Sequence, residues 1–256
     1  MLRKSSFARI HNLCRLGRNR FAFIEYGYHA WPQRYTLFIY SLDPQGNESS
    51  TPDHLATFNF PMMSLGTVPF THIHSSFPPA SRCHRMIHKK PNFVSHTSGV
   101  IQIRMVFART TPPFGFQVFL LPDVLLRAAK GQDGSPSTHA WDEWGPANTR
   151  WIKDPLGRLT PTLRPYGYRV GLLDYILDFN PHEVGRDICR DGSVDEESPK
   201  SRVVREPSIV FASKVVRQNI VSSLPYRVTS CTLENMPSKN TLSYVDEGLY
   251  FVEVCP

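Results

Sequence analysis

The chain has 256 residues, of which 41% are hydrophobic and 12% aromatic, a composition that excludes disordered and fibrous classes of protein. Its 22 prolines argue against long helices, because proline removes a backbone donor and fixes φ. The net charge of +7 does not indicate nucleic-acid binding: six basic residues and no acid lie in the first 20 positions, which leaves 23 of the 29 basic residues against 22 acidic ones.

Residues 1–20 form a basic segment that we expect to be poorly ordered. The segment contains no acid, and Leu2, Ile10, Leu13 and Leu16 lie at near-helical spacing. Mitochondrial presequences share this composition. A solvated basic connector shares it too and is the simpler interpretation.

Three runs in the first quarter of the chain predict strands, at residues 21–28, 35–42 and 55–62. The second run is apolar on both faces, so we expect it to be buried on both sides. An exposed turn is expected between the second and third runs, where Pro44, Gly46 and Asn47 lie.

A stretch rich in histidine follows, with the possible metal ligands His72, His74, Cys83, His84, His88 and His96. A zinc site needs four converging ligands of this kind. The spacing matches no zinc motif, however, and prolines separate the residues. We therefore interpret the stretch as a polar surface loop and expect no metal.

Residues 100–107 predict a half-buried strand, because alternate positions are apolar and Gln102 and Arg104 fall on the other face. Residues 114–121 predict its antiparallel partner. The next run, from Pro122 to Gly131, predicts a short helix, since proline opens it and glycine follows it.

Three of the four tryptophans lie between residues 141 and 151. Exposed aromatic rings beside an arginine would make a hot spot for a protein partner, so Trp141, Trp144 and Arg150 are the candidate partner-binding residues. Alternatively, the rings hold an irregular crossing against the core, with Gly145 and Pro146 making a bend. We favour this structural interpretation, because tryptophan is highly buried on average.

Strands are predicted again at residues 166–173 and 175–179. Residues 187–200 are acidic and nearly free of large apolar groups, so we expect a disordered surface insert near residues 190–200. The last predicted element is a hairpin, with strands at 242–245 and 249–254 around a turn that contains Gly248.

These elements predict a mainly β fold over residues 21–256, treated as a single domain. We expect antiparallel hairpins in a sandwich or in a propeller-like arrangement, complete or incomplete, with one or two short helices.

The sequence lacks the usual catalytic motifs, and we expect neither an enzyme nor a cofactor. His182 to Arg186 begins like a zinc-protease motif, but Arg186 occupies the position of the second histidine. The alternative is a β-rich carbohydrate hydrolase or other enzyme, for which Asp142 with Glu143, or Asp174 with Asp178, would supply the carboxylates. Adjacent side chains point apart, which argues against that alternative.

Five cysteines without a CxxC pair argue against a disulfide framework. No apolar run approaches the roughly 18 to 20 residues of a membrane-spanning helix. We therefore expect an intracellular protein, cytoplasmic or nuclear, with no membrane contact. A mitochondrial location is the minority expectation and rests on residues 1–20.

An ordered series of segments resembles the C-terminal region of F-box-associated proteins of basidiomycete fungi. The segments are Trp141 to Trp151, Tyr166 to Arg169, Leu177 to Val184, Glu206 to Ser208, Asn219 to Tyr226 and Tyr244 to Val252. The resemblance covers roughly residues 100–256, and nothing in residues 1–40 resembles the helical F-box that docks on the Skp adaptor of a ubiquitin ligase. It implies target recognition, so we expect a non-catalytic protein-recognition or scaffold domain with a protein partner. The Skp adaptor is expected as a partner only where an F-box lies upstream.

Overall fold

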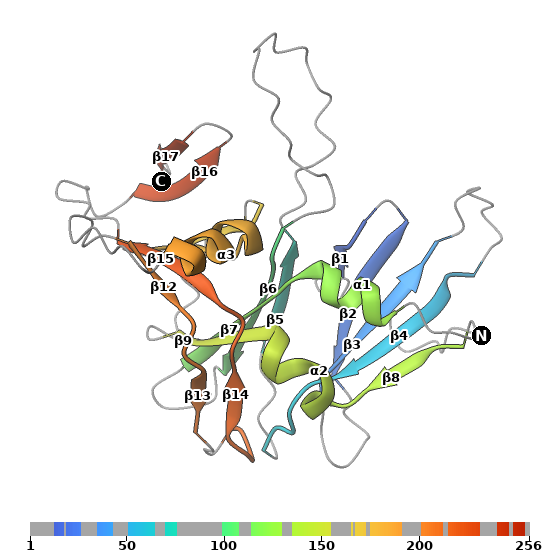
Figure 1. The fold of residues 1–256 in the computed structure, drawn as a ribbon. Coiled ribbons are helices and arrows are strands. Elements are labelled where there is room, and N and C mark those ends of the chain that lie inside the picture. Colours follow the sequence, from blue (N-terminus) through green and yellow to red (C-terminus); the bar gives the residue numbers. More distant parts are fainter. Residues whose placement is uncertain are drawn as a thin grey trace, which may run out of the picture.

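The computed structural model describes residues 13–17, 19–26, 35–42, 51–64, 70–75, 99–107, 114–129, 135–154, 165, 167–172, 175–190, 201–211, 215–230, 240–245 and 248–253. Over these ranges the chain forms seventeen strands and three helices (Figure 1). The strands belong to five sheets, in which all pairs but one are antiparallel. The predicted mainly β, antiparallel fold is confirmed, but three helices form where the sequence predicts one or two.

The first sheet has the strand order β1-β2-β3-β4-β8. Its strands are β1 (Leu13–Arg15), β2 (Arg20–Tyr26), β3 (Tyr35–Ser41), β4 (Asp53–Asn59) and β8 (Ser137–His139), and β8 runs parallel to β4. The prediction that residues 1–20 are poorly ordered is wrong for β1, which pairs with β2. Cys14 and Leu16 are both buried and lie two positions apart, which is the spacing of an extended chain and not of a helix.

Aromatic rings line the outer face of this sheet, and β3 is therefore half-buried on that face instead of buried on both. Phe23 stacks on Phe38 with ring centroids 5.2 Å apart, and Phe21 stacks on Tyr40 at 5.8 Å. His54 stacks on Tyr40 at 5.0 Å and continues the row on β4. We call these five residues the aromatic ladder. The rings cover one another face to face, which removes much of their area from water.

The second sheet has the order β5-β6-β7-β9 and forms the middle layer of the protein. Its strands are β5 (Phe70–Ser75), β6 (Ile101–Phe107), β7 (Phe114–Leu120) and β9 (Thr149–Asp154). One face packs with the first sheet in the larger core, where Ile103, Val118 and Trp151 lie. The other face is buried too, although it carries Gln102, whose side-chain nitrogen donates to Gln117 Oε1 at 2.9 Å. The prediction that β6 is half-buried is therefore wrong.

A third sheet covers that second face. Its order is β10-β11-β15-β12, with β10 (Arg169–Leu172), β11 (Tyr175–Asp178), β15 (Tyr226–Ser230) and β12 (Ser201–Val204). Val170 and Leu177 pack with Phe119 of the middle sheet in a second core. The described sheets thus stack as a sandwich-like arrangement, because each amphipathic face is buried against a neighbouring layer.

The remaining elements are α1 (Pro122–Ala128), α2 (Trp141–Asn148), α3 (Pro181–Arg190), β13 (Ser208–Val210), β14 (Ile220–Ser222), β16 (Asn240–Val245) and β17 (Gly248–Glu253). The predicted helix α1 and the predicted terminal hairpin β16–β17 are confirmed. Helix α3 packs on β12 and β15 (Figure 1) and runs to Arg190, so the predicted insert does not begin at residue 187. Residues 191–200 lie outside the described part of the chain.

Candidate interaction surface

Trp141 and Trp144 lie in α2, and Trp151 lies in β9, which follows it directly. All three are buried, and the rings of Trp141 and Trp144 meet edge to face with centroids 5.3 Å apart. Trp144 Nε1 donates a hydrogen bond of 3.0 Å to the backbone oxygen of Asn59, so its polar edge is satisfied. The structure therefore places these rings in the core, as the structural interpretation of the tryptophans predicts.

Gly145 and Pro146 lie inside α2, so the bend that the sequence predicts there is wrong. A Cβ atom at position 145 would come within 2.2 Å of ring carbons of Trp141, and only glycine allows the ring to lie this close. Pro146 lies inside the helix, where it has no backbone N–H to donate. Thr149 Oγ1 donates to the backbone oxygen of Gly145 at 2.8 Å and closes this end of the helix.

Arg150, the third predicted partner residue, is only 1% exposed and lies on the opposite face of β9 from Trp151. Its Nε donates to the backbone oxygen of Leu224 and its Nη1 to that of Glu206, both at 2.8 Å. The guanidinium lies over the ring of Tyr226, 5.1 Å from the centroid. Burial lowers the pKa of Arg150, and Tyr226 and Glu206 oppose that shift. Arg150 is thus an internal cross-link and is not a surface contact.

The two backbone oxygens that Arg150 binds belong to the two arms of one long hairpin, residues 201–230. β12 pairs with β15 at its base, and β13 pairs with β14 further along. Two serines fasten the outer part to β9: the backbone N–H of Trp151 donates to Ser222 Oγ at 2.9 Å, and Ser208 Oγ donates to the backbone oxygen of Trp151 at 3.2 Å. The hairpin is therefore held against the edge of the middle sheet at several points.

The outward face of β13 and β14 is apolar and exposed. Ile209 is 50% exposed, its cross-strand partner Val221 is 41% exposed, and Phe211 at the end of the strand is 70% exposed. We call these three residues the hairpin surface; strands β13 and β14 lie in the lower part of Figure 1. The alternate residues Val210 and Ile220 pack toward the larger core instead. Large contiguous patches of exposed apolar groups are a feature of interaction sites, which makes this surface a candidate.

The sequence does not single out these residues. Ile209, Val210 and Phe211 are three consecutive apolar residues, so their pattern does not tell which side faces the core. Each strand of the pair has only three residues, which is too few for a period to be recognised.

A pocket of about 440 Å³ lies beside the third sheet, on the face turned toward the middle sheet. It is lined by Ile152, Leu172, Tyr175, Leu177, Ser201, Arg202, Tyr226, Val228 and Ser230. Tyr175 stands at its rim with 48% of its surface exposed. The volume falls within the range of pockets that hold small molecules.

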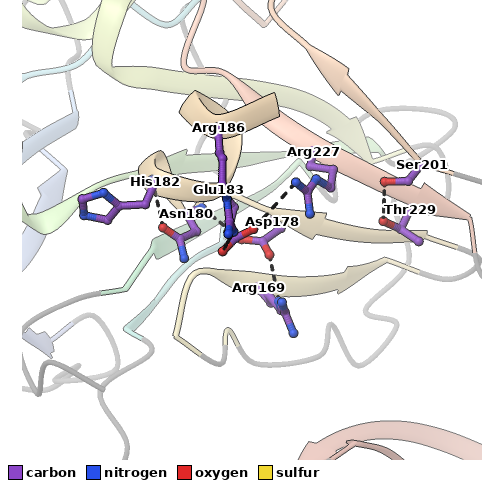
Figure 2. Close-up of polar contacts among 9 residues, drawn as sticks. All are labelled: Arg169, Asp178, Asn180, His182, Glu183, Arg186, Ser201, Arg227 and Thr229. Carbon is purple, nitrogen blue, oxygen red and sulfur yellow. Dashed lines mark hydrogen bonds and ion pairs between the residues drawn. The ribbon is translucent and has the colours of Figure 1, made fainter. Parts of the chain in front are cut away.

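The opposite face of the third sheet carries a polar network beneath α3 (Figure 2). Arg169 Nε binds Asp178 Oδ2 at 2.8 Å, and Asp178 Oδ1 accepts the backbone N–H of Asn180 at 3.0 Å. Asn180 Oδ1 in turn accepts the backbone N–H of His182 at the start of the helix. Glu183 pairs with Arg186 and lies 3.8 Å from Arg227 of β15. These contacts anchor α3 to the sheet.

Two of the four carboxylates considered for a hydrolase, Asp178 and Glu143, make structural contacts. Asp178 is held by Arg169, and Asp174 lies outside the described residues. Glu143 accepts the backbone N–H of Ala140 at 2.9 Å at the start of α2, beside the exposed Asp142.

Within the described ranges, no group of three or more histidine, cysteine or acidic residues is arranged to hold a metal. Two of the predicted candidates, His72 and His74, lie in β5. The other four, Cys83, His84, His88 and His96, lie outside the described residues.

Comparison of the chain with protein-family models, with curated proteins and with solved structures gives no match. Of the helices in the described ranges, none is both long enough and apolar enough to cross a membrane.

Proposed function

We propose that this chain is a non-catalytic protein-recognition domain and that the hairpin surface binds its protein partner. The single observation that carries the proposal is the exposure of Ile209, Phe211 and Val221 on one face of a two-stranded ribbon. Aromatic and aliphatic groups of this kind form the centre of protein interfaces, where their burial supplies most of the binding energy.

The way in which the hairpin is fastened supports the same proposal. Arg150 and Ser222 tie the ribbon to β9, so its backbone is fixed before a partner arrives. A preorganised surface loses less conformational entropy on binding than a flexible one. The resemblance to F-box-associated proteins also favours target recognition, and attachment to the Skp adaptor would need an F-box encoded upstream of Met1.

Site-specific crosslinking tests the proposal. A photoreactive phenylalanine analogue at position 211 should give covalent adducts with one or a few proteins in an extract of cells that express the chain. The matched control carries the same analogue at position 42, because Leu42 is 48% exposed and follows β3 of the first sheet. The adducts should be specific to position 211.

A second variant makes the result decisive. Ile209→Asp places a charge on the hairpin surface without touching the core, and it should abolish the adducts formed from position 211 while the circular dichroism of the protein is unchanged. Identical adducts from positions 211 and 42, or adducts that survive Ile209→Asp, would contradict the proposal.

A further inference from the structure

We propose that the pocket beside the third sheet binds a small organic carboxylate with an apolar body. This site is separate from the hairpin surface and does not depend on the proposed protein-recognition function.

The volume and the lining of the pocket indicate that the body of the ligand is apolar. The pocket has a volume of about 440 Å³, and Ile152, Leu172, Leu177 and Val228 supply apolar side chains to it. Tyr175 and Tyr226 add two aromatic rings. Such a lining favours a compact apolar or aromatic group, because transfer of that group out of water is the main favourable term.

The charge of the lining indicates the polar end of the ligand. Among the described residues that line the pocket, Arg202 is the one charged residue and none is acidic. It lies directly across from Val228 in the strand register, so its stem starts on the pocket face of the sheet. Arg202 is exposed, and its charge acts on the exposed carboxylate of Glu206. A guanidinium in this position matches a carboxylate, which it binds through two parallel N–H groups.

A second cation lies behind the pocket wall. The guanidinium of Arg150 is 5.1 Å from the ring centroid of Tyr226, which itself lines the pocket. Arg150 is 1% exposed, it binds two backbone oxygens, and its Nη2 has no hydrogen-bond acceptor among the described residues. The hydrogen bonds of Arg150 go to backbone oxygens, and the acid that acts on its charge, Glu206, is exposed. A buried charge is weakly screened, so its field favours an anion in the adjoining pocket.

Glu206 is the acid that competes with such a ligand. Its pKa is lowered first by its own backbone N–H and that of Arg205, and then by Arg202 and Arg150. Its carboxylate is exposed and does not line the pocket, so the space beside Tyr226 stays open to a ligand anion.

Phenylacetate is a suitable probe, because it joins one carboxylate to one aromatic ring. We expect it to shift the two-dimensional NMR signals of residues around the pocket, with a dissociation constant on the order of 10 mM, the affinity that a molecule of this size reaches. Phenylacetamide, which has the same shape without the charge, should bind at least about threefold more weakly, as expected for one exposed ion pair. Phenethylamine should not bind.

Three variants of the full chain complete the test. Arg202→Gln should remove the preference for phenylacetate over phenylacetamide, and Ser230→Phe should abolish binding of both, since Ser230 is an exposed rim residue whose replacement fills the pocket. Arg127→Gln removes an exposed charge in α1, which contributes nothing to the pocket, and should bind like the unmodified chain. Unchanged circular dichroism shows that each variant is folded.

Equal binding of phenylacetate and phenylacetamide, equal loss of affinity in Arg202→Gln and Arg127→Gln, or no saturable shift at all would overturn the proposal. The crosslinking result at position 211 is independent of these outcomes, so failure of the carboxylate site and failure of the protein-recognition function are distinguishable.

Discussion

Two glycines in helices have opposite surroundings, although the sequence alone treats them alike. Gly145 in α2 lies against the ring of Trp141, whereas Gly185 in α3 has nothing within 4 Å of the position where a Cβ would stand. The first glycine is required by close packing between a ring and a backbone. The second serves no visible packing purpose, and in a helix it costs conformational entropy.

The same substitution at both positions should therefore have effects of opposite sign. We expect Gly145→Ala to lower the free energy of unfolding by about 1–3 kcal/mol, because the added methyl group overpacks the core. Gly185→Ala should raise it by about 0.5–1 kcal/mol. Urea unfolding measures both. A neutral Gly145→Ala variant would contradict the packing around Trp141.

At the scale of single elements, the first sheet shows how an outward face can be stabilised without a further layer. The aromatic ladder places rings of β2, β3 and β4 in one stacked row, with Phe23 opposite Phe38 and Phe21 opposite Tyr40 in the strand register. Because the faces of the rings are used within the row, mainly their edges meet water. The ladder is accordingly a source of sheet stability.

Removal of the central ring tests this view of the ladder. Phe38 stacks on Phe23 and also contacts His54, with ring centroids 5.7 Å apart in the second case. Phe38→Ala should lower the free energy of unfolding by about 2 kcal/mol, from the lost ring contacts and the exposure of its neighbours. Thr36→Ala, on the same strand and the same face, is the control and should change it by less than about 0.5 kcal/mol.

Sequence patterns predict individual elements of this protein better than their packing. Alternation predicts β7, and proline followed by glycine predicts α1, because both signals are local. Helix α2 is not predicted, because glycine followed by proline indicates a turn. The reason for the glycine is the ring of Trp141 that lies against it, and the sequence does not reveal this contact. Of the candidate site, Arg150 is identified from sequence only as a residue of interest. Its role needs the hairpin that reaches it from residues 206 and 224.

At the scale of the whole molecule, the burial of the polar residues in the middle sheet could not be predicted from the sequence. Gln102 and Gln117 have the spacing of water-facing residues, yet both are buried under the third sheet. A period of two separates the two faces of a strand but does not tell water from another layer. The number of layers therefore follows from contacts between distant segments, which a single sequence does not reveal.

Arg150 holds two of these layers together, so its removal should loosen one part of the protein more than the rest. Arg150→Met should lower the free energy of unfolding by about 2–3 kcal/mol, because it leaves the buried backbone oxygen of Leu224 and the part-buried one of Glu206 without their charged donors. Hydrogen exchange should speed up in residues 201–230 before it does in β2 and β3. Uniform acceleration across the chain would contradict this role. Arg127→Met, at an exposed site in α1, is the control.

The position of β8 in the first sheet affects the order in which this sheet can form during translation. β4 ends at Asn59, but the strand that covers its open edge begins at Ser137. At roughly 5–20 residues per second, translation needs about 4–16 s to reach that point, and during this interval the backbone groups along the β4 edge have no partner strand. A nascent chain is therefore vulnerable to aggregation at this edge, and chaperone binding to translating ribosomes should peak while residues 60–137 are being made.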